Sequence, residues 1–283
     1  MRYQAVEALR NEYPVNVLCN TLGVSLSGYY AWKKRPVSQH QLEDSQLAEH
    51  IHVAYQASRQ VYGSPRMHAE WRDQGIICSR RRVARLMRER GLSACRLRHR
   101  KITTHSMPGA RVAPNRLNQE FTATRPNEKW AGDITAIWTY EGWLYLAVVL
   151  DLYSRRVIGW ALAATEGTKR SLSGLSRWHC LVGTRQLACC FIRIGDRNIP
   201  VMQARALLAN VGVTVSMSRT GNCYDNALTE SFFGTLKGEC VERISFQTRG
   251  QARQIIFEYV ECFYNRVRRH STLGYVSPAA FEQ

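Results

Sequence analysis

The feature that most constrains the fold of this chain is a pair of apolar, β-branched runs, WLYLAVVL and VIGWAL, joined by the polar segment DLYSRR (residues 143–162). Such runs around a short turn predict an antiparallel β-hairpin. A β-rich run, DITAIWTY, precedes the hairpin, and the later segments NALTESFFGTLKGEC and RQIIFEYVECFYNRVRRH predict helices, the second of them long. Strands followed by helices indicate a layered α/β domain, which we place at residues 129–283.

The first 40 residues predict a small helical unit. The segment VNVLCNTLGVSLSGYYAWKK reads as two helices separated by a turn at Gly23, with Ser25 as the N-cap of the second helix. This pattern is typical both of a helix-turn-helix and of an ordinary helical hairpin.

Residues 41–102 predict a second helical unit with one strongly basic helix. A turn at Gly63-Ser64-Pro65 opens a helix that ends at Gly75, and Ser79 is placed to cap the next helix, RRRVARLMRE. One face of that helix is apolar, and arginines occupy most of the remaining surface. A solvated helix face would also be charged, but the density and single sign of these charges favour contact with phosphates. The predicted DNA-binding residues are Arg80, Arg81, Arg82, Arg85 and Arg88.

The overall charge of the chain also favours contact with phosphates. Lys and Arg outnumber Asp and Glu by 39 to 22, which gives a formal net charge of +17 and predicts a polyanionic partner. The sequence contains neither a run of eighteen apolar residues nor a signal-peptide core, so we expect no membrane association and a cytoplasmic location. Residues 103–128 are rich in Pro and lack an apolar period, which predicts a linker between the basic region and the α/β domain.

Two carboxylates in the α/β domain are candidates for chemistry. Asp133 lies within the first β-rich run, where a carboxylate costs free energy unless it is paired, metal-bound or at a strand edge. Glu230 precedes Lys237 by two helical turns, so both side chains lie on one helix face. Lys237 suits either a DNA phosphate beside Glu230 or a surface ion pair.

Several long segments resemble one family. They are GDITAIWT, GWLYLAVVLDLYSRRVIGWAL, SMSRTGNCYDNALTESFFGTLKGE and FYNRVRRHSTLGYVSPAAFE, with VYGSPRMHAEWRDQG upstream. Together they resemble the second-reading-frame transposase of bacterial insertion sequences of the IS-three group. The resemblance implies a helix-turn-helix region followed by a ribonuclease H-like core similar to retroviral integrase. It also implies an Asp-Asp-Glu triad that holds two Mg²⁺ or Mn²⁺ ions, with Asp133 and Glu230 as the first and third ligands.

The triad suits metal-dependent cleavage and strand transfer at the ends of a DNA element. Two ions about 4 Å apart activate the attacking oxygen and stabilise the leaving oxygen of an in-line displacement. Mg²⁺ prefers carboxylate and water oxygens, which explains the use of Asp and Glu.

The second ligand of the triad is missing from this sequence. The family separation of 35 residues before the Glu places the second Asp at position 194, which is occupied by Ile194. Asp196 has the same strand parity, but it lies about 6.6 Å further along and would misplace one ion. We therefore expect the chain as written to be catalytically impaired, with Asp196 as a poor substitute.

The local sequence indicates a shifted reading frame over residues 170–203, approximately. Because most residues have several possible codons, one set of codons can be chosen for residues 190–201 and then read from one base earlier. The shifted reading encodes Leu-Phe-His-Ser-Asp-Arg-Gly-Ser-Gln-Tyr-Thr-Ser. This is the family pattern, and its Asp falls at position 194. The spacing on either side of the window is unchanged, so two compensating shifts are implied.

The C-terminal segment FYNRVRRH adds Arg266 and Arg269 as predicted DNA contacts, although cations at a helix C-terminus are also favoured by the helix dipole. By resemblance, the partners are the element's terminal inverted repeats, target DNA, a second copy of the chain on that DNA, and the product of the upstream reading frame. The location implied is the bacterial nucleoid. The alternatives are a catalytically dead DNA-binding remnant or regulator, and an RNA nuclease, which would need a fourth carboxylate.

Overall fold

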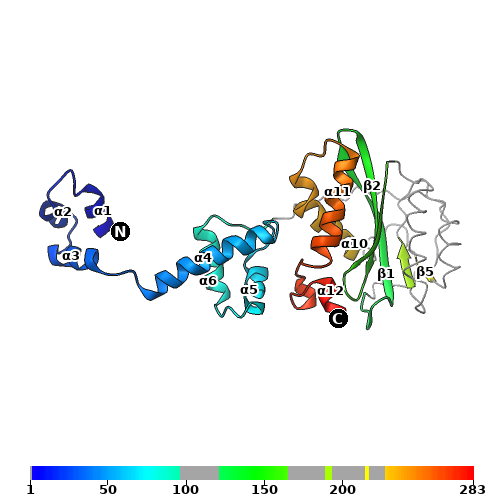
Figure 1. Cartoon of the computed structure of the whole chain (residues 1–283), viewed down its shortest axis with the longest axis horizontal. Coiled ribbons are helices and arrows are strands. Elements are labelled where there is room, and N and C mark those ends of the chain that lie inside the picture. Colours follow the sequence, from blue (N-terminus) through cyan, green and yellow to red (C-terminus); the bar gives the residue numbers. More distant parts are fainter. Residues whose placement is uncertain (1, 96–120, 165–188, 193–213, 217–226) are drawn as a thin grey trace. The chain divides into compact units, whose positions relative to one another are not determined.

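The structure is a computed structural model that describes residues 2–95, 121–164, 189–192, 214–216 and 227–283 (Figure 1). The chain divides into two compact units, Met1–Val53 and Ala54–Gln283. Most of the predicted linker at 103–128 lies outside the described residues, and the predicted domain boundaries at residues 40, 102 and 128 stay predictions.

The first unit begins with three short helices, and the structure leaves the choice between a helix-turn-helix and a helical hairpin open. Helices α1 (Arg2–Leu9), α2 (Val15–Thr21) and α3 (Leu26–Lys34) enclose a small core of Val6, Leu18, Cys19 and Tyr29. Gly23 has a φ of +62°, and the Ser25 hydroxyl accepts a hydrogen bond from the N–H of Gly28 at 3.1 Å. The predicted turn and N-cap are thus confirmed.

The basic region forms helices as predicted. Helix α4 (Gln39–Ala57) is followed by α5 (Ser64–Asp73), with Gly63 at its N-cap, and by α6 (Arg80–Glu89). The Ser79 hydroxyl caps α6 by accepting a hydrogen bond from the N–H of Arg82 at 3.2 Å. The apolar face of α6 is buried through Val83, Leu86 and Met87. The arginines therefore cover the remaining surface of this helix.

The α/β domain contains a five-stranded sheet of order β3-β2-β1-β4-β5. The predicted hairpin is confirmed: β2 (Gly142–Asp151) pairs antiparallel with both β3 (Val157–Ala163) and β1 (Lys129–Thr139). Two short strands, β4 (Cys189–Ile192) and β5 (Thr214–Ser216), continue the sheet in parallel with β1.

Helices cover one face of this sheet (Figure 1). Helix α10 (Ala227–Glu239) packs on β1 and β2 and buries Phe232, Phe233 and Leu236. The chain continues through η2 (Val241–Arg243), α11 (Arg249–Phe257), η3 (Glu258–Tyr264), η4 (Ser271–Leu273) and α12 (Pro278–Phe281). Layered α/β architecture is thus confirmed.

The predicted long C-terminal helix is not a uniform α-helix. The α-helical part, α11, ends at Phe257, and η3 is a π-helix, in which the N–H of Asn265 bonds the carbonyl of Val260 at 3.0 Å. The wider turn puts Tyr259, Val260, Phe263 and Tyr264 all in the core. A regular 3.6-residue period read from the sequence cannot anticipate such a change.

Asn265 follows the π-helix and joins it to β3. Its side chain accepts a hydrogen bond from the N–H of Val157 at 2.9 Å and donates one to the carbonyl of the same residue at 3.0 Å. Asn265 is only 4% exposed, so no solvent can replace these bonds.

Substitution of Asn265→Leu should therefore destabilise the α/β domain. Two buried backbone groups would lose their partners, at a cost of about 2–6 kcal/mol in the free energy of unfolding. Urea unfolding followed by circular dichroism measures the change, with Arg266→Ala at the exposed neighbouring position as the control. A loss below about 1 kcal/mol for Asn265→Leu would contradict the assigned role.

Candidate functional site

The structure places Asp133 on the helix-covered face of the sheet. Asp133 is half-buried in β1 opposite Val148 of β2, and Val148 in turn lies opposite Trp160 of β3. Residues paired across strands share a face. The Trp160 indole donates a hydrogen bond to Glu261 of the π-helix at 2.8 Å, so this row of side chains faces the helical layer.

Glu230 lies in the first turn of the helix that covers this face. Leu228 of α10 packs against the buried cluster of Ala131 and Leu152, and strand alternation puts Ala131 and Asp133 on the same face of β1. Glu230 itself is exposed. The fold thus brings together the strand that carries Asp133 and the helix turn that carries Glu230, as the proposed metal site requires.

The strand expected to carry the second ligand runs beside Asp133. In the parallel pairing of β4 with β1, Ile192 aligns with Gly132, the residue before Asp133. Ile194 and Asp196 come two and four positions after the end of β4, outside the described residues. The described residues contain no group of three or more His, Cys, Asp or Glu side chains placed to hold a metal.

The basic face of α6 is open to solvent at both ends of the helix. Arg80, Arg81 and Arg88 are exposed, whereas Arg82 and Arg85 are half-buried, and Arg85 pairs with Glu89 at 2.9 Å. The first turn of α6 contains no acidic residue, so the partial positive charge of the helix N-terminus adds to that of the arginines. This end of α6 suits phosphate binding.

The remaining predicted contacts have different surroundings. Lys237 is half-buried on α10, two turns after Glu230, and Arg266 is exposed after the π-helix. Arg269, by contrast, has a side chain only 13% exposed.

The side chain and the backbone N–H of Arg269 both bond to other residues of the protein. Its guanidinium donates a hydrogen bond to Glu70 at 2.7 Å and also pairs with Asp73, and its backbone N–H bonds the hydroxyl of Tyr62 at 2.8 Å. Tyr62 donates in turn to the carbonyl of Val267 at 3.1 Å. We therefore interpret Arg269 as a residue that docks the C-terminal segment on α5, in place of the expected DNA contact.

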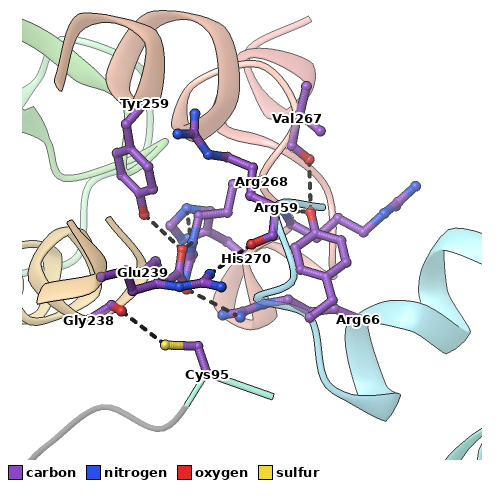
Figure 2. A network of polar contacts seen from close by, with 12 residues as sticks. Arg59, Arg66, Cys95, Gly238, Glu239, Tyr259, Val267, Arg268 and His270 are labelled. Atoms are coloured by element: carbon purple, nitrogen blue, oxygen red, sulfur yellow. Dashed lines mark hydrogen bonds and ion pairs between the residues drawn. The ribbon is translucent and has the colours of Figure 1, made fainter. Parts of the chain in front are cut away.

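A buried carboxylate lies at the centre of a second docking network (Figure 2). Glu239 is 5% exposed and accepts two hydrogen bonds at 2.7 Å from the guanidinium of Arg268. It also accepts one from the hydroxyl of Tyr259 at 2.8 Å and lies 3.7 Å from Arg66 of α5. Burial opposes the charged form of Arg268, but its bonds to Glu239 raise its pKa overall.

His270 is an uncharged neighbour of this network. Burial, together with the charges of Arg268, Arg66 and Arg155, lowers the pKa of His270 to about 3. Its ring stacks edge-on against Tyr264, with centroids 5.0 Å apart. These surroundings give the imidazole a packing role at neutral pH. The sequence did not predict the roles of Glu239 and Arg66. Each is a single charged residue whose partner is distant in the chain, and no sequence motif identifies such a pair.

Comparison with known proteins defines the class. The chain matches the model of an HTH-like domain at residues 41–101 and models of an integrase core domain at residues 123–223 and 211–278. The protein thus combines a helix-turn-helix-like region with an integrase-type α/β core, as its sequence predicted.

Curated relatives narrow the class to one family. The chain is 41% identical to the "Insertion element IS600 uncharacterized 31 kDa protein" of Shigella sonnei, over 94% of this chain and 97% of that protein. It is 38% identical to "Transposase InsF for insertion sequence IS3A" of Escherichia coli strain K12, over 100% of this chain and 98% of that protein. The chain belongs to the IS3 family of insertion-sequence transposases, and by family it is an enzyme of the polynucleotidyl transferase type.

Among solved structures, the catalytic core domain of HTLV-2 integrase in complex with magnesium aligns with a TM-score of 0.43 at 14% identity, over 57% of this chain and 100% of that one. At this level the likeness adds nothing to the family assignment. Within the described residues, no helix is long and apolar enough to cross a membrane.

Loss of the Glu239 carboxylate should destabilise the second unit strongly. Glu239→Leu would leave the buried guanidinium of Arg268 unpaired, at a cost of about 3–5 kcal/mol in the free energy of unfolding. The matched control is Glu242→Leu, three residues along and exposed. Equal stability of the two variants in urea unfolding would show that the network is dispensable.

The pairing of Arg269 with α5 is tested by exchanging its charges. Glu70→Arg and Arg269→Glu should each destabilise the protein, and the double variant should recover part of the loss. We expect a coupling energy of about 0.5–3 kcal/mol in a double-mutant cycle. Strictly additive effects would mean that the two side chains do not interact in solution.

Proposed function

We propose that Asp133 and Glu230 are two ligands of the divalent-metal site with which this transposase family cuts and joins DNA. The observation that carries the proposal is the packing of α10 on β1, which puts the first turn of the helix over the face of the sheet that bears Asp133. Asp133 lies on β1 and Glu230 on α10, and position 194, which the family spacing predicts for the second ligand, follows β4 in the sequence and lies outside the described residues.

The donors at this site fit the metal. Both side chains are carboxylates, the oxygen donors that Mg²⁺ and Mn²⁺ prefer, and neither is fully buried, so a DNA phosphate can approach. Two bound ions would supply the activation of the attacking oxygen and the neutralisation of the leaving oxygen. The protein's own part is to hold the carboxylates on a rigid sheet and helix, while Lys237 on the same face of α10 binds a neighbouring phosphate.

The DNA-binding surface that we propose is the basic face of α6, with Arg80, Arg81 and Arg88 as its exposed cations and Arg82 and Arg85 as flanking ones. Arg266 adds a further exposed cation in the second unit. The ligands are the terminal inverted repeats of the element and its target DNA, bound by an oligomer of the chain in the bacterial nucleoid. The HTH-like match at residues 41–101 supports this assignment.

Ile194 is the reason to expect weak catalysis. An alkyl side chain cannot coordinate a metal, and Asp196 would have to reach the site from a displaced position. A misplacement of 1 Å can already cost about 10²-fold in rate. A second candidate function, DNA binding without catalysis as a remnant or regulator of transposition, follows from the same residue.

Catalysis by the chain as written should be at least about 10²-fold below that of a repaired variant. The repaired variant carries Leu-Phe-His-Ser-Asp-Arg-Gly-Ser-Gln-Tyr-Thr-Ser at residues 190–201, and joining of labelled element ends to a plasmid in Mg²⁺ or Mn²⁺ is the measurement. Asp133→Asn in the repaired chain should abolish joining. Equal activity of the unrepaired and repaired chains would overturn the assignment of position 194.

Removal of two α6 cations should weaken DNA binding of any sequence. Each lost phosphate contact reduces the slope of log K against log salt by about 0.9, so Arg80→Gln with Arg81→Gln should reduce it by about 1.8. Arg253→Gln, exposed on α11, is the charge-matched control. An unchanged slope for the α6 variant would place the DNA elsewhere.

A further inference from the structure

A cavity of 170 Å³ lies in the second unit, among the turn after β2, α10 and the C-terminal segment. Four basic side chains line it: Arg66, Arg155, Arg268 and His270. Figure 2 shows Arg66, Arg268 and His270 gathered around Glu239. None of the described residues considered above for metal or DNA binding lines this cavity.

The guanidinium of Arg155, which lines the cavity, has one buried nitrogen, Nη1, that lacks a hydrogen-bond partner among the described residues. A buried donor without a partner costs free energy, and each such group in a native protein calls for an explanation, such as an ion or a water. Burial also lowers the pKa of Arg155. The backbone at Arg155 has a φ of +62°, and the hydroxyl of Tyr264 bonds its carbonyl, which holds the residue in place.

The acids near the cavity are already engaged. Glu239 is bonded by Arg268 and Tyr259, and Asp151 accepts hydrogen bonds from the hydroxyl of Ser154 at 3.0 Å and from the N–H of Tyr153. Burial raises the pKa of Asp151. A third carboxylate, Glu282, accepts a hydrogen bond from Ser154 and pairs with Arg156. Among the described residues that line the cavity itself, three carry a guanidinium group and Asp151 carries a carboxyl group, while the neutral His270 adds no charge. The balance at the cavity is positive.

The rim of the cavity is polar and open. Ser231, Ser271 and Thr272 line the cavity and are exposed, whereas Arg268 on the opposite wall is buried. A single water molecule needs at least about 10–15 Å³ of such space, so the cavity of 170 Å³ has room for a ligand larger than water. Hydroxyl groups around an entrance and guanidinium groups inside are the donors that phosphate oxygens accept from.

We propose that this cavity binds a phosphate group, with Arg155 as its principal donor and the Ser271 and Thr272 hydroxyls at its mouth. The phosphate belongs either to a DNA backbone or to free inorganic phosphate. The first source rests on the proposed function, since Ser231 adjoins Glu230 in α10 and a phosphodiester at the mouth would lie near the proposed metal site. The second source does not depend on it.

Inorganic phosphate is the first probe, used on the full chain. Thermal unfolding in phosphate is compared with unfolding in chloride at equal ionic strength. Saturating phosphate should raise the Tm by about 5 °C. Arg155→Gln should lose this response. Arg156→Gln is the matched control: Arg156 is the next residue, is exposed, pairs with Glu282 and does not line the cavity. It should respond as the unmodified chain does.

The exposed rim supplies a variant that tests the cavity without disturbing the core. Ser271→Ala with Thr272→Val should weaken the response to phosphate about tenfold in the concentration required. This second variant keeps the test decisive if Arg155→Gln fails to fold. Normal phosphate response in the rim variant, together with normal response in a folded Arg155→Gln, would overturn the proposal.

DNA binding then separates the two sources. If a DNA phosphate occupies the cavity, Arg155→Gln should reduce the salt slope of DNA binding by about 0.9, and Arg156→Gln should not. A phosphate response without a slope change identifies free phosphate as the ligand. The absence of both effects would mean that water satisfies Arg155, and would refute the site. If the unmodified chain binds no DNA, the proposed function fails, while the phosphate titration still tests the cavity.

Discussion

The interaction on which the second unit depends is the buried carboxylate of Glu239. It ends α10, and the groups that bind it come from three other segments: Tyr259 from the π-helix, Arg268 from the C-terminal segment, and Arg66 from α5. A buried carboxylate costs free energy unless each of its lone pairs has a hydrogen-bond partner. The four segments must therefore pack together in one arrangement for the unit to be stable. The candidate ligand Glu230 lies in the first turn of α10, and the contacts of Glu239 hold the last turn of the same helix in place.

This arrangement links α6, the helix that we propose to bind DNA, to the core through α5. Arg66 contacts Glu239, and Glu70 and Asp73 contact Arg269, so one face of α5 is devoted to the catalytic unit. Helix α6 packs against α5 and keeps its arginines outward.

Local signals in the sequence were enough to predict the elements. The Ser25 and Ser79 caps and the strands of the hairpin were correctly anticipated, because each depends on residues a few positions apart. The contacts that assemble the unit were not predictable in this way. Arg268 is 29 positions from Glu239, and Arg269 is 199 positions from Glu70, so only the folded chain shows the pairing.

The same limit explains the differences at the candidate site. Asp133 and Glu230 were predicted as ligands from their resemblance to the family motifs and stay predictions. Arg269 was predicted to contact DNA from its place in a basic segment, and nothing in the sequence indicated its acidic partners on the distant helix α5. The π-helix was missed because a one-residue insertion into a helical period leaves no mark in composition. Position 194 was predicted from the family spacing and from the shifted reading frame, and the parallel pairing of β4 with β1 is the structural feature that supports it.

Binding of Mn²⁺ to the repaired chain and to two isosteric variants of it tests the central claim, that carboxylates from β1 and α10 serve one metal site. Electron paramagnetic resonance measures free Mn²⁺ during a titration. The account predicts that Asp133→Asn and Glu230→Gln each remove the same binding event, because both carboxylates serve one site. Retention of full binding in either variant would contradict it.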